Sequence, residues 1–331
     1  MYREIIGPAY HMAHNISHVA SENYLIHSHA FYELYYFVGG DVHILYDGTE
    51  YALLPHTFII FVPDVFHGLR VANSNPYERY TAHFTEELIA PKRRDVLMGN
   101  LPTEETIRSG AETHPYILQD AEKLDILPLM QEYEKLIQFP EPLRDAMAGA
   151  VTETILARYL LHVYEGRRIV GVQPYHKGKN ELAPILSYIH QNLTQKLTLD
   201  DLSVRFHLSK GKLNQLFHQQ MEMSTMDYVT KRRISYAQQL LLNGIPAAQA
   251  GSAAGFGDYA GFYRAYKKTL GHSPSDDHRS VSGNSMMQTL YQETSSPGPV
   301  VADDSLSNTN IWDVNRSTRA SEIDISVLRD K

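Results

Sequence analysis

The sequence predicts an α+β multidomain chain, with an N-terminal antiparallel β-barrel of jelly-roll type, a helical appendage and an all-α C-terminal part. Two observations carry this prediction. Short aromatic and β-branched runs separated by turn residues fill residues 20–90, a pattern typical of an antiparallel barrel or sandwich. Farther along, apolar residues recur every three or four positions, as on one face of a helix. We expect domains at 1–165 and 181–280, a linker at 166–180 and a disordered tail at 281–331.

The composition favours a globular protein of the cytoplasm. The chain has 331 residues, of which 43% are apolar and 21% charged, enough for two domains with their own cores. No run of about 18 apolar residues is present and no apolar leader follows Met1, so we expect no membrane span and no signal peptide. The absence of cysteine excludes disulfides and thiolate metal sites, which fits a cytoplasmic location.

Five runs in the N-terminal part predict short strands. Each combines aromatic and β-branched residues, and turn residues such as Gly39-Gly40-Asp41 separate them. Tyr24, Tyr35, Tyr46 and Phe58 either line an apolar pocket or are ordinary core aromatics, and the sequence leaves both interpretations open. The runs are Tyr24–Ile26, Tyr32–Val38, Val42–Tyr46, Thr57–Val62 and Arg79–Phe84.

Three histidines and one carboxylate lie among these strands. His27, His29 and Glu33 share parity, so on an extended strand their side chains point to one face, and His67 follows on a later strand. This group resembles the cupin barrel signature, and the resemblance implies a three-histidine, one-carboxylate site suited to Fe, Mn, Ni or Zn. The alternative is a polar barrel mouth, in which these residues hydrogen-bond to one another or to a ligand. The turn at 54–57 lacks the glycine that usually follows the proline of the signature.

The barrel residues are also candidates for binding a small effector. We expect no required cofactor, while a divalent metal ion in the barrel stays open. Sugars stack on aromatic rings and hydrogen-bond to polar groups, so a carbohydrate is the effector we expect. His11, His14, His43 and His83 show no partner spacing, and we interpret them as structural or exposed. The candidate effector-binding residues are His27, His29, Glu33, His67 and Tyr35.

Residues 120–165 predict a pair of amphipathic helices. Pro140-Glu141-Pro142 separates the two apolar stripes. Such a pair either packs on the barrel or forms a contact with a second protomer, and the sequence leaves both open. The first stripe is Leu129, Met130, Tyr133, Leu136 and Ile137, and the second is Leu143, Met147, Val151, Ile155 and Tyr159.

The C-terminal part contains one helical device twice. In the first copy, Thr198 and Asp201 form a capping signal ahead of a short helix, and Ser209 is a good N-cap for the next helix. In the second copy, a small-residue helix follows Pro246, and Asp258 caps its partner. The residues expected to face inward are Leu199, Leu202 and Phe206, then Leu213, Leu216 and Phe217, and in the second copy Phe262, Tyr266 and Leu270.

Two tandem helix–turn–helix units with polar outer faces are what entry into DNA major grooves requires. The segment Lys179–Arg279 holds 12 Lys/Arg and 8 Asp/Glu, so it carries about +4 within a chain of net charge −8. Lys and Arg contact phosphates, while Asn, Gln and Arg also contact base edges. The DNA-binding candidates are Lys210, Lys212, Asn214, Gln215, His218, Arg232, Tyr259, Ala260, Tyr263, Arg264, Lys267 and Lys268.

The run Leu199–Arg279 resembles the AraC/XylS type of bacterial transcription regulator. The resemblance implies two helix-turn-helix subdomains that enter successive major grooves. The chain departs from the family at Ala247 and Ala250, where Ile or Leu is usual, and Gly251 lowers helix propensity by about 1 kcal/mol relative to Ala. Gly211 also offers no side chain at a position that often contacts bases, and Asp277 and His278 replace an aromatic residue and an Arg. The matching residues are Ser209, Leu213, Leu216-Phe217, Asp227-Tyr228, Arg232-Arg233, Gly255–Asp258, Phe262–Lys268 and Gly271–Ser275.

We therefore predict a sequence-specific regulator of transcription, an activator or a repressor, that binds double-stranded DNA under control of a small effector. It acts as a homodimer, RNA polymerase is a further candidate partner, and the protein is not an enzyme. One alternative is a metal-dependent cupin enzyme with an appended DNA-binding module, and another is a non-specific nucleoid protein. In the tail, Ile311-Trp312-Asp313-Val314 is an alternative docking peptide.

Overall fold

The computed structural model describes residues 2–280, apart from residues 21–25, 47–48, 74, 104–116, 120 and 166–180. The predictions of a linker at 166–180 and of a disordered tail with a docking peptide lie outside the described residues, as does Tyr24. Among the described residues, no helix combines the length and apolar character needed to cross a membrane.

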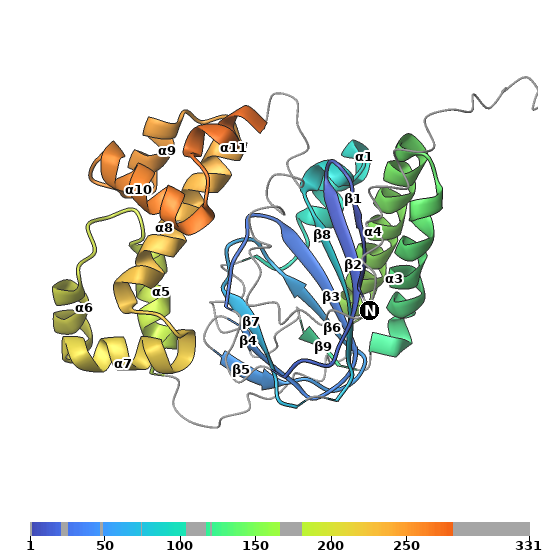
Figure 1. The fold of residues 1–331 in the computed structure, drawn as a ribbon, viewed down its shortest axis with the longest axis horizontal. Coiled ribbons are helices and arrows are strands. Elements are labelled where there is room, and N and C mark those ends of the chain that lie inside the picture. Colours follow the sequence, from blue (N-terminus) through green and yellow to red (C-terminus); the bar gives the residue numbers. More distant parts are fainter. Residues whose placement is uncertain are drawn as a thin grey trace, which may run out of the picture. The chain divides into compact units, whose positions relative to one another are not determined.

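The N-terminal domain contains two antiparallel sheets (Figure 1), which confirms the predicted antiparallel β-architecture. The described strands form these two sheets rather than one continuous hydrogen-bonded barrel. The larger sheet has the order β1-β2-β8-β3-β6-β9, and the smaller sheet has the order β5-β4-β7. The strands are β1 (Tyr2–Ile6), β2 (Tyr10–Ser17), β3 (Tyr32–Gly39), β4 (Val42–Tyr46), β5 (Thr49–Ala52), β6 (Thr57–Phe61), β7 (His67–Val71), β8 (Tyr77–Phe84) and β9 (Ile117–Leu118).

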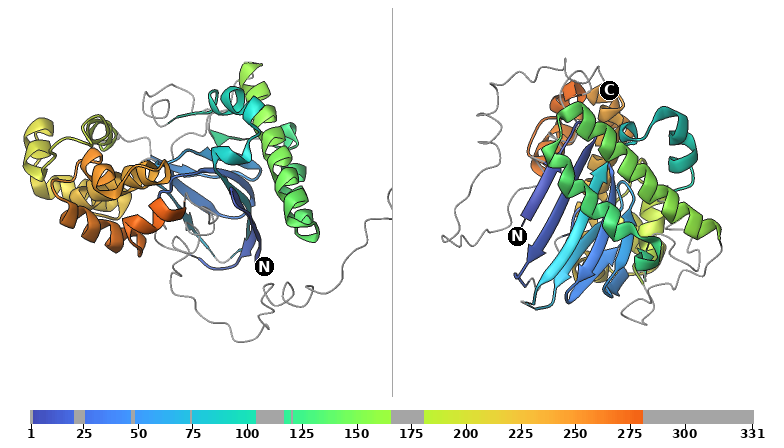
Figure 2. Two further views of the ribbon diagram at one scale, coloured as in Figure 1. Left: turned by 90° about the horizontal axis from the view of Figure 1, so that it is seen from above. Right: turned by 90° about the vertical axis from the view of Figure 1, so that its right-hand side faces the viewer.

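The larger sheet has two chemically different faces because side chains alternate along each strand. Tyr10, Leu34 and Ala82 belong to the apolar core shared with the helices, whereas Glu33 and His83 lie at the opposite parity. Figure 2 shows α3 (Ile126–Lys135) and α4 (Glu141–Tyr164) crossing one face of this sheet. The remaining helical segments of this domain are η1 (Glu86–Leu88), α1 (Pro91–Met98), η2 (Ala121–Leu124) and η3 (Leu136–Gln138).

Helices α3 and α4 pack on the larger sheet. Packing on the β-domain, one of the two arrangements that the sequence leaves open, is therefore confirmed. Tyr10 donates a hydrogen bond to Asp145 on α4, with 2.7 Å between the oxygens. The prediction that Leu143 and Ile137 belong to the buried stripes is wrong, since they are 49% and 46% exposed. The buried face of α4 includes Ala148 and Gly149. A Cβ added at Gly149 would lie 2.9 Å from the Leu88 carbonyl oxygen, so the glycine permits this close approach.

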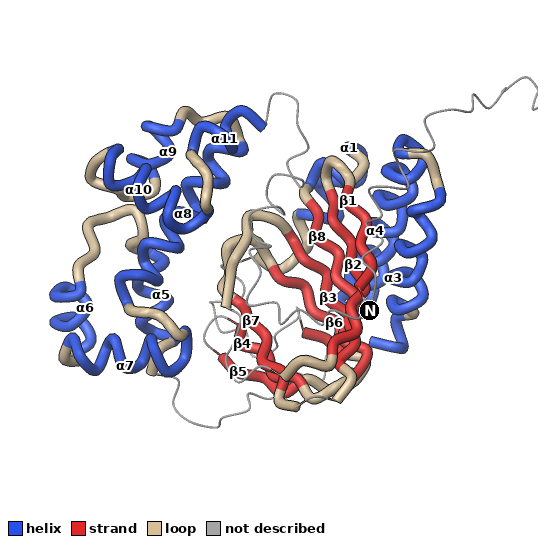
Figure 3. The backbone as a smooth tube through the Cα atoms, viewed as in Figure 1, coloured by secondary structure: helices blue, strands red, loops and turns tan. Residues whose placement is uncertain are grey.

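The helical C-terminal part contains two small cores, and α8 contributes to both. Figure 3 shows α8 running from the side of α5 and α7 to the side of α9 and α11. Tyr228 and Val229 of α8 pack in the first core, and Ile234, Ala237 and Leu241 pack in the second. The repeated helix–turn–helix pattern is therefore joined by one shared helix. The helices are α5 (Ala183–Gln191), α6 (Leu199–Phe206), α7 (Lys210–Met221), α8 (Thr225–Leu242), α9 (Ala247–Ala253), α10 (Tyr259–Leu270) and α11 (Pro274–Ser280).

The predicted helix starts are confirmed by their caps. Thr198 and Asp201 form a reciprocal capping box at α6. The Ser209 side chain accepts a hydrogen bond from the Lys212 amide, and Asp258 accepts one from the Gly261 amide, which fixes the first turns of α7 and α10. Local sequence signals thus determine where α7 and α10 begin.

Two departures from the family pattern have structural reasons. A Cβ added at Gly251 would lie 2.6 Å from the Phe262 ring, so the glycine lets α9 approach α10 closely. Asp277 is fully buried and accepts hydrogen bonds from Gln238 Nε2 at 3.1 Å and from the Tyr266 hydroxyl. It therefore ties α11 to α8 and α10 in place of the usual apolar contact.

Replacing Gly251 by alanine tests the close approach of α9 and α10. Although alanine has the higher helix propensity, we expect Gly251→Ala to lower the free energy of unfolding by about 1–3 kcal/mol through overpacking against Phe262. Gly211→Ala is the matched control, because its Cβ would meet nothing closer than 3.9 Å and should stabilise by up to about 1 kcal/mol. Urea unfolding followed by circular dichroism measures both, and equal stabilisation would contradict the packing role.

Candidate functional site

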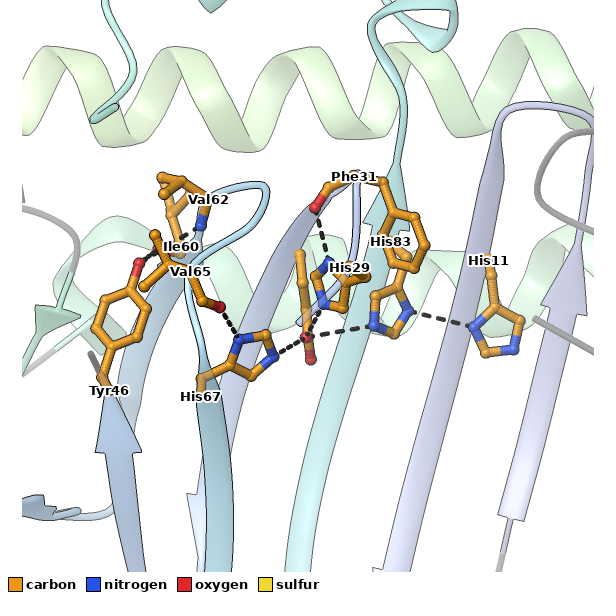
Figure 4. A network of polar contacts seen from close by, with 10 residues as sticks. His11, His29, Phe31, Tyr46, Ile60, Val62, Val65, His67 and His83 are labelled. Carbon is orange, nitrogen blue, oxygen red and sulfur yellow. Dashed lines mark hydrogen bonds and ion pairs between the residues drawn. The ribbon is translucent and has the colours of Figure 1, made fainter. Parts of the chain in front are cut away.

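Four buried side chains converge on the polar face of the larger sheet (Figure 4). Glu33 on β3 is 5% exposed, and its Oε2 atom lies 3.2 Å from Nε2 of His29. The same oxygen lies 3.3 Å from Nε2 of His67, which begins β7, and 3.3 Å from Nε2 of His83 on β8. One carboxylate oxygen is thus surrounded by three imidazole nitrogens.

The sequence prediction placed three of these four residues together. His27, His29, Glu33 and His67 meet as expected, since each offers a potential ligand atom within 4.8 Å of the other three. His27 is the exposed member, and its backbone also bridges to that of His67, with N–O distances of 2.9 and 3.0 Å. Tyr35 is buried and its hydroxyl lies 2.7 Å from that of Tyr77.

The sequence analysis interprets His11 and His83 as structural or exposed. In the structure both are buried and adjoin the cluster around Glu33. His83 lies opposite both Glu33 and His11 in the register of the larger sheet. Nδ1 of His83 is 3.3 Å from Nδ1 of His11, whose Nε2 is 2.9 Å from a carboxylate oxygen of Glu4 on β1. Parity within one strand does not pair residues of two strands, so the sequence holds no signal for this contact, which comes from the register of β2 and β8.

Burial and mutual contacts shift the ionisation of this cluster. Burial lowers the pKa of His29 to about 4, against the opposing effect of the neighbouring Glu33 carboxylate. Burial alone would raise the pKa of Glu33, but the contacts of its carboxylate with the imidazoles of His83, His29 and His67 hold it well below its usual range. Burial likewise lowers the pKa of His11 to about 4, against its hydrogen bond with Glu4. At neutral pH the carboxylate is therefore ionised, while His11 and His29 are neutral.

A second polar group lies on the same face of the larger sheet. Arg79 on β8 donates a hydrogen bond to the Tyr77 hydroxyl at 2.5 Å, and Tyr77 in turn contacts Tyr35. These residues share parity with His83 and Glu33 along their strands. The face therefore offers a cation and two phenols near a ring of imidazoles, a set of groups able to anchor a polar ligand.

The candidate DNA-binding residues divide between two exposed helix faces. Nearly all of them are exposed or half-buried, as a face that enters a groove requires. The polar side chains alternate with the buried Leu213, Leu216 and Phe217 on α7 and with Phe262 and Tyr266 on α10. On α7 the face presents Lys210, Lys212, Gln215 and His218, and on α10 it presents Tyr259, Ala260, Tyr263, Arg264, Lys267 and Lys268.

Two candidates have structural partners instead. Arg232 is 2% exposed, and its guanidinium lies 3.4 Å from Nδ1 of His190 on α5, so its prediction as a phosphate contact is corrected. The side-chain oxygen of Asn214 accepts a hydrogen bond from the Thr225 amide at 3.1 Å, which makes it part of the turn before α8. Lys210 stays exposed but pairs with Asp200 at 2.6 Å.

Comparisons with known proteins match both parts of the chain. The AraC-like ligand binding domain matches residues 16–97 and the helix-turn-helix domain matches residues 202–280. The uncharacterized HTH-type transcriptional regulator YfiF of Bacillus subtilis is 24% identical over 76% of this chain and 78% of its own length. The arabinose operon regulatory protein of Escherichia coli is 36% identical over 29% of this chain and 34% of its own length.

Among solved structures, ToxT from Vibrio cholerae aligns over 83% of this chain and 100% of its own, with 11% identity and a TM-score of 0.34. A ligand-binding β-domain followed by a helix-turn-helix domain defines a regulator of transcription. The chain belongs to the AraC family of transcriptional regulators.

The lowered histidine pKa values predict a loss of stability in acid. His11 and His29 take up a proton mainly on unfolding, so stability falls as the pH drops from about 6.5 toward 4. With a chelator present, we expect each to cost about 2 kcal/mol by pH 4.5. Urea unfolding across this range should show a smaller slope for His29→Gln and an unchanged slope for the exposed-site control His18→Gln. Equal slopes in both variants would refute the assignment.

Proposed function

We propose that the chain binds a specific operator through the exposed faces of α7 and α10 and that a small effector bound in the N-terminal domain controls this binding. The observation that carries the proposal is the repeated geometry. Ser209 and Asp258 fix the starts of two helices that each bury one apolar face and expose a polar one. Helices of this kind supply base and phosphate contacts in a major groove. The arrangement favours sequence-specific binding over a nucleoid role.

The proposed effector site is the polar face of the larger sheet. His29, Glu33 and His67 provide its buried polar end, and Tyr35 and Arg79 lie farther along the same face. Hydroxyl-rich or anionic compounds suit these groups, and a carbohydrate stays the expected class. In this proposal residues 1–165 sense the effector, residues 181–280 bind DNA, and the cytoplasmic protein activates RNA polymerase. The enzyme alternative finds no support among the relatives, which are regulators.

The exposed side of α4 supports a homodimer. From Leu143 to Tyr164, its exposed positions, three or four residues apart along the helix, carry no charge. A helix face that meets only water is usually charged or polar. Leu161 and Tyr164 at one end are 60% and 73% exposed. We assign this face to the contact with a second copy of the chain, and its members are Leu143, Ala146, Ala150, Thr154, Ala157, Leu161 and Tyr164.

Arg264→Ala tests base recognition by α10. In this proposal the exposed Arg264 side chain contacts a base edge, so its loss should lower operator affinity by about 1–3 kcal/mol and relax base choice at one position. The operator is first selected from random duplexes with the full-length protein, and gel-shift titration then measures both quantities. Unchanged affinity and base preference would remove Arg264 from this role.

Lys267→Ala is the matched control for charge. A phosphate contact should weaken all duplexes alike and reduce the salt dependence of binding, without changing base preference. Equal affinity of the native chain for selected and random duplexes would instead show a non-specific nucleic-acid-binding protein.

Ala150→Glu tests the proposed dimer face. A charge at the centre of the uncharged side of α4 should raise the dimer dissociation constant at least tenfold, because burying an unpaired carboxylate costs several kcal/mol. Gln131→Glu places the same charge at an exposed position of α3 and should leave the dimer intact. Sedimentation velocity measures both, and a dimer that survives Ala150→Glu would exclude this face.

A further inference from the structure

We propose that the buried polar cluster of the N-terminal domain binds one divalent transition-metal ion. Its four ligands are His29, Glu33, His67 and His83. The ligand set differs from the one that the cupin resemblance implies, which has His27 in place of His83. This inference does not depend on operator binding. It shares His29, Glu33 and His67 with the proposed effector site and makes a metal ion part of that site, and metal binding can be tested without any effector.

The first argument is the direction of the imidazole lone pairs of His29 and His67. Nδ1 of His29 lies 2.9 Å from the Phe31 carbonyl, and Nδ1 of His67 lies 3.0 Å from the Val65 carbonyl. A carbonyl oxygen only accepts, so each Nδ1 carries the proton and donates it. In a neutral imidazole the lone pair is then on Nε2, the atom that faces Glu33. Backbone carbonyls orient metal-binding histidines in this way.

The second argument extends the same logic to His83. The Glu4 carboxylate accepts a hydrogen bond from Nε2 of His11, so the lone pair of a neutral His11 is on Nδ1. Nδ1 of His83, 3.3 Å away, is the donor to that lone pair. The Nε2 atom of His83 therefore also presents a lone pair to Glu33. A chain of two hydrogen bonds from Glu4 sets the tautomer of the third imidazole.

These tautomers leave the cluster with too many acceptors. Three lone pairs surround a carboxylate oxygen that is itself an acceptor, at 3.2–3.3 Å. Protonating all three imidazoles would bury three positive charges beside one negative charge, which is costly in an apolar domain. Nε2 of His67 is buried without a hydrogen-bond partner, as an atom awaiting a ligand would be. A single cation at the centre satisfies all four groups.

The spacing and chemistry of the donors fit a transition metal. Metal–ligand bonds of about 2.0–2.2 Å place neighbouring ligand atoms roughly 2.8–3.6 Å apart in octahedral or tetrahedral geometry. The observed separations of 3.2 and 3.3 Å from Glu33 fall within this range. Three imidazoles and one carboxylate suit Zn²⁺, Ni²⁺, Co²⁺, Fe²⁺ or Mn²⁺, whereas Mg²⁺ and Ca²⁺ prefer oxygen.

His27 lies close to the cluster but has a different position. Its candidate ligand atom is within 4.8 Å of those of His29, Glu33 and His67. Its side chain is exposed, while the four proposed ligands are 3–6% exposed. We therefore assign His27 to the solvent side of the site, where its loss should matter less than the loss of His83.

Co²⁺ binding to the full-length native chain tests the proposal. After removal of metals with a chelator, titration calorimetry and visible absorption should show one Co²⁺ per chain, displaced by Zn²⁺. Absence of binding at millimolar Co²⁺, or only weak binding of several ions, would overturn the proposal as an adventitious interaction.

Variants then test the ligand set. We expect His83→Ala to weaken Co²⁺ binding by more than a hundredfold, and His11→Gln to weaken it about ten- to a hundredfold by releasing the orientation of His83. His43→Ala is the matched control, since His43 is similarly buried but pairs with Glu50. Tight binding by His83→Ala together with its loss in His27→Ala would replace the proposed set by the one with His27.

A measurement on the native chain covers the case in which a variant does not fold. X-ray absorption of the zinc-loaded protein should show scattering from three imidazoles at the metal, and selective hydrogen–deuterium protection of β8 around His83 should accompany metal binding. Two or fewer imidazoles, or no protection at β8, would overturn the assignment of His83.

Discussion

The alternation of side chains across the larger sheet is the constraint on which the N-terminal domain depends. The register places Leu34 opposite Ala82 on the apolar face, and it therefore places Glu33 opposite His83 on the polar one. A slip of one residue would exchange the faces, burying the carboxylate beneath α3 and α4. The hydrophobic contacts with these helices thus hold the polar cluster together, although none of them touches it.

A cluster of this kind is costly for a fold to keep. An ionised carboxylate loses several kcal/mol of hydration when buried, and its hydrogen bonds or an added cation must offset that loss. Glu33 is surrounded by groups that are themselves oriented from outside, by two backbone carbonyls and by the link through His11 to Glu4. Because the apolar core could be built without this expense, the cluster points to a function rather than to stability.

The helix starts of the C-terminal part could be predicted from the sequence, whereas the full set of site residues in the N-terminal domain could not. The starts of α6, α7 and α10 were predicted because Thr198, Ser209 and Asp258 act on amides within three residues. His83 was not predicted as a site residue because its partners come from β2 and β3, which pair with it only after folding. The β2 sequence mixes His and Asn with apolar residues and so conceals its strand pattern.

The same limit applies to the DNA-binding part. Gly251 looked like a weak point in a helix, and its reason is a ring eleven residues away in sequence, on Phe262. The charge of Arg232 predicts a contact with DNA phosphate, but its side chain is buried beside His190. Propensity and charge are properties of single residues, whereas contacts between helices depend on both partners.

The position of the cluster between the two sheets suggests how an occupant would act. His67 belongs to β7 of the smaller sheet, while Glu33 and His83 belong to the larger one. Any ligand held by both sets binds most tightly when the two sheets keep the separation that these distances define. A ligand shifts a conformational equilibrium only through such a difference in affinity between states. Filling this site would therefore favour one spacing of the sheets, and the elements attached to each sheet would move with it.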